Sequence, residues 1–157
     1  MNQWIRRGLG ILALGGGAIG LSGGMMTTMQ APATLASVLI IFPAMAFFLW
    51  GIWCGVQMLE AGAQAVHCNA IFWLVQVPII QGSSFGYLAF CGAQIQVFLK
   101  TNPAELGFFA SMFGAQFGVY LGRALERSAF GINLFAVAMV FLLLRSLPVQ
   151  ASCVKSD

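Results

Sequence analysis

Charged residues are scarce in this chain. Seven Lys or Arg and four Asp or Glu among 157 residues amount to 7%, against about 25% in a soluble domain. Hydrophobic residues make up 60%. So little polar surface does not suit a small water-soluble globule, a disordered chain or a free nucleic-acid binder. The composition therefore predicts an integral, multi-pass membrane protein whose surroundings are the lipid bilayer, with no nucleic-acid partner.

Catalytic motifs are missing as well. The four cysteines form no CxxC pair, and a single histidine, His67, gives no zinc-type ligand spacing. The 19 glycines precede no Lys-Ser or Lys-Thr pair of a phosphate-binding loop, and no nucleophile motif or carboxylate pair is present. The sequence thus predicts a protein that is not an enzyme and carries no cofactor.

Long uncharged windows are present instead, the longest from residue 8 to residue 59. A membrane span needs roughly 20 apolar residues, so this window accommodates two helices and a turn. The apolar runs and the turn signals between them predict four membrane helices, at about residues 8–26, 35–59, 68–83 and 129–146.

The chain begins with two adjacent basic residues, Arg6 and Arg7, before the first apolar run. By the positive-inside tendency, they predict a cytoplasmic N-terminus. A basic start before an apolar run also fits a secretory signal peptide, but no small-x-small cleavage site follows. We therefore expect a retained first helix.

Residues 84–127 allow two interpretations. As helix, Gly114, Gly118 and Gly122 form a small-xxx-small stripe and five spans result. As strands, residues 93–97 alternate apolar and polar side chains, and residues 108–121 also divide between two faces. The second interpretation gives four spans and an extracytoplasmic, strand-rich insert, and a count of basic residues on each side does not separate the two.

A resemblance favours the second interpretation. Residues 73–78 (Trp-Leu-Val-Gln-Val-Pro), Tyr87, Gly92 and residues 131–136 (Gly-Ile-Asn-Leu-Phe-Ala) resemble a pattern of small uncharacterised four-helix bacterial membrane proteins. The resemblance covers residues 70–145 and implies four helices with a strand-rich insert, in a bacterial inner membrane. It implies no activity.

The predicted fold class is an all-α integral membrane protein, with 1–157 as a single membrane domain, four transmembrane helices and a small extracytoplasmic insert at 84–127. Five transmembrane helices are the alternative.

Small residues recur at helical spacing on the first two predicted helices. Gly16, Gly20 and Gly24 form a tandem GxxxG, and Gly51 and Gly55 form another. Lipid gives no hydrophobic drive for helix association, so such stripes let helix backbones approach closely. They predict packing between the chain's own helices, or docking onto a partner helix.

Two groups of side chains are candidate sites. Met25, Met26 and Met29 are thioethers at the end of the first helix, a ligand type suited to Cu(I), although methionine also fills gaps in apolar packing. A polar site is predicted from Glu60, His67 and Cys68, which are metal-ligand types or proton carriers, and from Asn133, an amide in the last apolar run. The alternative is that Glu60, His67 and Cys68 are solvated at the membrane interface. For Asn133 the alternative is a buried hydrogen bond between two helices.

The predicted function is that of a non-catalytic accessory subunit or assembly partner of a larger membrane complex, through a membrane protein partner or a homo-oligomer. A small oligomeric transporter or channel component is the alternative, suggested by amides within apolar segments. A metal- or cofactor-handling membrane protein is a second alternative, suggested by the methionines.

Overall fold

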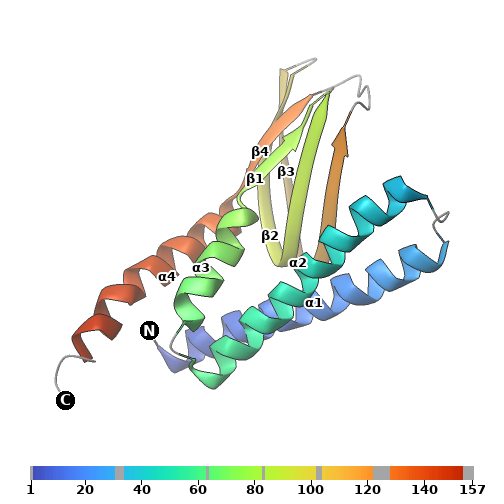
Figure 1. Cartoon of the computed structure of the whole chain (residues 1–157). Helices are drawn as coiled ribbons and strands as arrows, with labels where there is room; N and C mark the ends of the chain where they lie inside the picture. The colour runs from blue at the N-terminus through green and yellow to red at the C-terminus, as the bar shows by residue number, and fades with distance from the viewer. Residues whose placement is uncertain are drawn as a thin grey trace.

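The computed structural model describes residues 2–30, 34–62, 64–82, 84–101, 104–121 and 128–153. It combines long helices with an antiparallel sheet (Figure 1). In chain order the elements are α1 (Gln3–Gln30), α2 (Leu35–Glu60), α3 (Ala65–Val75), β1 (Pro78–Gln81), β2 (Phe85–Thr101), β3 (Ala104–Leu121), β4 (Ala129–Asn133) and α4 (Leu134–Cys153).

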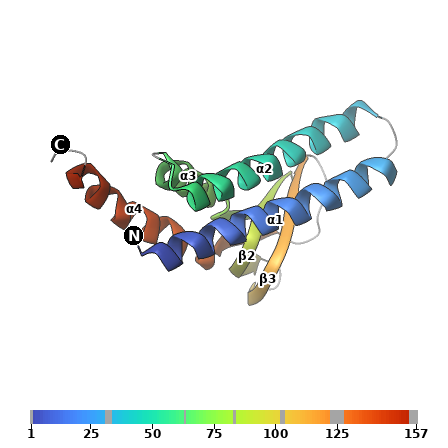
Figure 2. The ribbon, with the colours of Figure 1, turned by 90° about the horizontal axis from the view of Figure 1, so that it is seen from below.

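Helices α1 and α2 form an antiparallel hairpin, and α1 lies across strands β2 and β3 (Figure 2). Thr34 caps α2, since its hydroxyl oxygen accepts a hydrogen bond from the Ser37 N–H. The helix ends at Glu60, and Ala61 caps it in a left-handed conformation, so that the N–H groups of Ala61 and Gly62 both donate to the Gln57 carbonyl. Pro43 lies inside the helix. These two helices are long and apolar enough to cross a membrane.

The sheet is antiparallel and curls back on itself. Its strand order is β1-β4-β2-β3, with a further pairing of β1 to the start of β2. Strands β2 and β3 pair along almost their whole lengths, and β4 pairs with the second half of β2. The register shifts between Gly92 and Gln94, and Gly92 has a φ of 103°. A side chain is strained at such a φ, so glycine allows β2 to bend where α1 crosses it.

Aromatic rings fill the core between α2, α3 and the sheet. Phe72 and Trp73 are fully buried. The Phe72 ring stacks on Phe47 at 5.3 Å and meets Trp50 edge-on at 5.4 Å between centroids. Phe47 also contacts Phe117 of β3. This cluster fixes α2 and α3 on one face of the sheet.

The predicted fold class is wrong. The chain is not an all-α protein with four spans, because it contains a four-stranded sheet and only α1 and α2 qualify as spans among the described residues. Helix α3 has 11 residues, about 17 Å at 1.5 Å per residue, against a hydrocarbon core of about 30 Å. The apolar part of α4, Leu134–Ser146, is also too short. The multi-pass description, four or five spans alike, is therefore not supported.

Two predicted helix boundaries fail for the same reason. The third helix was expected at 68–83, but α3 ends at Val75 and residues 78–81 form β1. The fourth was expected at 129–146, but residues 129–133 form β4 before α4 begins. An apolar run of four to eight residues fits a buried strand as well as a helix. These two runs are strands because residues 78–81 pair with residues 129–132. The alternating segments at 93–97 and 108–121 do lie in strands.

Candidate functional site

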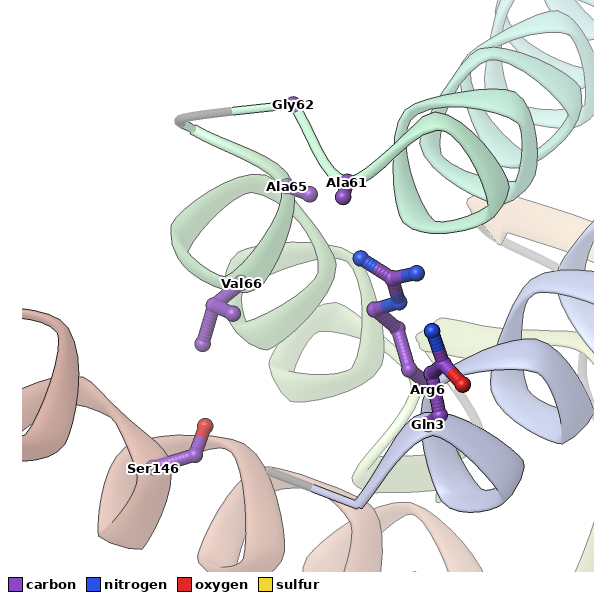
Figure 3. A pocket seen from close by; sticks show the side chains of 7 residues that line it. All are labelled: Gln3, Arg6, Ala61, Gly62, Ala65, Val66 and Ser146. Carbon is purple, nitrogen blue, oxygen red and sulfur yellow. The ribbon is translucent and has the colours of Figure 1, made fainter.

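A small pocket lies where the N-terminal end of α1 meets α3 and α4 (Figure 3). Its volume is about 160 Å³. It is lined by Gln3 and Arg6 of α1, Ala61 and Gly62 after α2, Ala65 and Val66 of α3, and Ser146 of α4. Three helices, α1, α3 and α4, and the turn between α2 and α3 therefore meet around one arginine.

Helical phase explains why Arg6 faces inward and Arg7 does not. In a helix that begins at Gln3, Arg6 shares a face with Leu9, Gly10 and Ala13, which are three, four and seven residues further on. All three are buried in the structure, whereas Arg7 is exposed. The sequence interpretation began this helix at residue 8 and used both arginines only for orientation. The phase of the apolar face was the signal that could have identified Arg6.

A second, larger pocket of about 360 Å³ lies between α1, α2 and β3. Apolar or small side chains dominate its lining, and Thr27 and Gln116 are the polar ones. The Thr27 hydroxyl donates to the Gly23 carbonyl of its own helix, so it is already satisfied. This pocket suits an apolar chain or side chain and offers no constellation for chemistry.

The polar residues predicted from sequence do not form one site. Glu60 ends α2 and is exposed, His67 is an exposed residue of α3, and Cys68 packs against the core. The described residues contain no group of three or more His, Cys, Asp or Glu side chains that could hold a metal ion. Asn133 lies elsewhere, at the junction of β4 and α4.

The predicted methionine site lies at the far end of the α1–α2 hairpin. Met25, Met26 and Met29 are all exposed, and Met29 most of all at 88%. The described residues offer no cluster of three or more His, Cys, Asp or Glu side chains at this end or elsewhere. Their arrangement is that of an apolar surface, which thioethers cover as readily as aliphatic side chains do.

The glycine stripes serve contacts within the chain. A Cβ on Gly55 would meet the Gly10 carbonyl oxygen at 2.7 Å, so here α2 packs closely on α1. Gly20 and Gly24 face Phe48 and Met45 of α2. Gly51 faces Phe72 of α3 at 2.8 Å. These contacts leave no free stripe for a partner helix along those positions.

Gly16 differs from the others because its neighbour is a strand. A Cβ there would lie 2.6 Å from the Gly92 Cα and 2.7 Å from the Cys91 carbonyl carbon. Beside this contact the Cys91 thiol donates to the Ala13 carbonyl at 3.6 Å. Burial raises the pKa of Cys91 to about 12, so this thiol stays protonated and is not a nucleophile. Gly16 and Gly92 thus let the backbones of α1 and β2 pack closely together.

Two buried amides connect the helices to the strands. The Gln76 Oε1 accepts from the Cys91 N–H at 2.7 Å, and its Nε2 donates to the Phe72 carbonyl. The Asn133 Oδ1 accepts from the N–H groups of Ile95 and Ala136 at 3.2 and 3.4 Å. Asn133 is thus the cap of α4 and a link to β2, rather than a bond between membrane helices.

Replacing Asn133 by leucine is expected to lower the unfolding free energy by about 1–3 kcal/mol, because two N–H groups lose their acceptor. Thermal unfolding in a non-ionic detergent measures the change. Gln116→Leu is the matched control, since this amide is exposed and its loss is expected to change stability by less than about 0.5 kcal/mol. Equal losses for the two variants would contradict the role of Asn133.

Comparison with known proteins adds no further assignment, since no protein-family model, no curated protein and no solved structure matches this chain.

Proposed function

We propose that this protein is a non-catalytic accessory protein, attached to a membrane by its α1–α2 hairpin and joined to a membrane protein partner through strand β3. One observation carries the proposal. Half of the hairpin extends beyond the sheet (Figure 1). That half is uncharged and exposes large apolar side chains. These are Met25, Met26, Met29, Leu35, Val38, Leu39, Ile40 and Phe42. An apolar patch of this kind marks a surface that lipid or protein covers.

The part of α1 nearest the N-terminus supports its retention in the protein. Leu9 and Ala13 are buried in the core, and Gly16 packs on the sheet. Removal of α1 as a signal sequence would expose that face of β2. We propose that the N-terminus lies on the cytoplasmic side of a bacterial inner membrane, since Arg6 and Arg7 lie in the first turns of α1, before its uncharged part.

The partner surface is β3, which has one neighbouring strand in the described sheet. Leu106, Phe108, Met112 and Phe113 of this strand are exposed. Long apolar edge strands pair readily with other chains, and an open edge does not persist in hydrocarbon. A protein partner that covers β3 would pair its open edge and bury its apolar side chains, while the hairpin remains in contact with lipid.

Two leucine-to-lysine variants separate membrane attachment from partner binding. Leu39→Lys places a charge on the hairpin, which costs about 3 kcal/mol near the centre of a bilayer. We expect the wild-type protein to stay in the membrane pellet after carbonate washing and Leu39→Lys to be released. Leu106→Lys, on β3, is expected to stay in the pellet but to lose its co-purifying membrane protein. Mass spectrometry of the affinity-purified complexes measures the partner.

Three results would overturn the proposal. A wild-type protein in the soluble fraction, or release of both variants alike, contradicts attachment by the hairpin. An N-terminus that mass spectrometry places after the first helix contradicts retention of α1. A homo-oligomer that Leu106→Lys leaves intact contradicts the accessory role, and would direct attention to the transport alternative.

A further inference from the structure

The Arg6 pocket contains a cation without a counter-charge. Its lining residues include no carboxylate. Lys100 and Glu105 of the β2–β3 hairpin form the single ion pair of the described residues, and Glu60, which precedes the pocket residue Ala61, is exposed and makes none. A partly buried guanidinium is therefore left without the partner that such a charge requires.

The geometry of Arg6 points to a ligand inside the pocket. The guanidinium projects toward Ala61 and Ala65 from α1 (Figure 3). Its Nε is buried and has no hydrogen-bond partner among the described residues. Since an unsatisfied buried donor is costly, a group that accepts from this nitrogen would stabilise the folded protein.

The start of α3 adds positive potential to the same space. Ala65 and Val66, its first two residues, line the pocket. The residue before them, Gln64, provides no side-chain capping hydrogen bond, and the first turn has no acidic side chain. The Ala65 N–H already donates to the Gly62 carbonyl. No side chain of the first turn compensates the positive end of this helix dipole, which faces the same volume as Arg6.

We propose that this pocket binds a phosphate group, held by the Arg6 guanidinium and the amino end of α3. The fork of arginine matches a phosphate through paired hydrogen bonds, and Gln3 supplies a further amide at the rim. A volume of about 160 Å³ is below the roughly 300 Å³ at which sites for whole small molecules begin. The pocket therefore takes the phosphate itself, either free or as the headgroup of a phospholipid whose chains lie outside.

Adjacent arginines provide a matched pair of variants. Arg6→Gln removes the pocket cation, and Arg7→Gln removes the same charge from an exposed neighbour. The full-length protein in non-ionic detergent is titrated with sodium phosphate against sodium chloride of equal ionic strength, and thermal unfolding is followed. Phosphate is expected to stabilise the wild type and Arg7→Gln, with binding at least about tenfold weaker in Arg6→Gln, since that variant loses the charge-assisted hydrogen bonds to the anion.

Native mass spectrometry distinguishes the two sources of phosphate. Phosphatidylglycerol that stays bound to the wild type and Arg7→Gln, but not to Arg6→Gln, identifies a lipid headgroup. A response to inorganic phosphate without retained lipid identifies the free anion, and this result stands even if membrane attachment by the hairpin is disproved. Arg6→Lys keeps the charge but loses the fork, so it is expected to fold and bind with intermediate affinity. Equal behaviour of Arg6→Gln and Arg7→Gln, or no response of the wild type to either probe, overturns the proposal.

Discussion

Replacing Gly16 by alanine is expected to detach α1 from the sheet and to lower the unfolding free energy by about 3 kcal/mol. The added Cβ would meet Gly92 and Cys91 through backbone atoms, which cannot rotate away as a side chain can. Inserting a methyl group into a packed interior costs about 1–3 kcal/mol, and contact with rigid backbone belongs at the upper end. Thermal unfolding in detergent measures the loss.

The adjacent Gly15 is the control for this prediction. A Cβ at Gly15 has no heavy atom within 4 Å, so Gly15→Ala is expected to be neutral or to stabilise the helix by up to about 1 kcal/mol. Cys91 gives a local readout, since it is fully buried beside Gly16. Maleimide labelling, assigned to each cysteine by mass spectrometry, is expected to reach Cys91 in Gly16→Ala but not in Gly15→Ala. Unchanged protection in Gly16→Ala would contradict the close contact.

Replacing Phe72 by alanine is expected to cost about 3–5 kcal/mol, the range for a fully buried aromatic ring. The ring touches Phe47, Trp50 and Trp73, so its removal leaves a cavity between α2 and α3. Phe108→Ala is the matched control, because that ring is 68% exposed on β3 and its loss is expected to cost less than about 1 kcal/mol.

A double-mutant cycle tests the position of the ring more directly. Gly51→Ala is expected to destabilise the wild type, since its Cβ would lie 2.8 Å from the Phe72 Cζ. In the Phe72→Ala background that neighbour is absent, so the cost of Gly51→Ala is expected to fall. Additive losses would show that Gly51 and Phe72 do not interact and would contradict the packing of α2 on α3.

The candidate sites were predictable only in part. Sequence spacing marked Gly16, Gly20, Gly51 and Gly55 as close-packing positions, and the structure gives each a neighbour within the chain. It did not reveal that Gly16 packs on a strand, since the partner, Gly92, is distant in sequence. The Arg6 pocket was missed for a similar reason. Its lining comes from α1, α3, α4 and the turn before α3, and no local pattern shows that they converge.

Local chemistry sufficed for the α1–α2 hairpin. The uncharged window at 8–59 is long enough for two spans, and the structure has two long helices there, the second capped by Thr34. Helices form from contacts between near neighbours, so such a segment specifies its own structure. The alternation in residues 93–97 is local in the same way and does lie in a strand.

Tertiary structure decided the remainder. Residues 78–81 and 129–133 are short apolar runs that fit a helix or a strand, and they become strands because they pair with each other and with β2. Backbone hydrogen bonds between distant segments are invisible to sequence periodicity. Asn133 illustrates the difference. The sequence showed an amide in an apolar run, whereas the fold made it the cap of α4 and a link to Ile95, because burial gives its oxygen no water to bond.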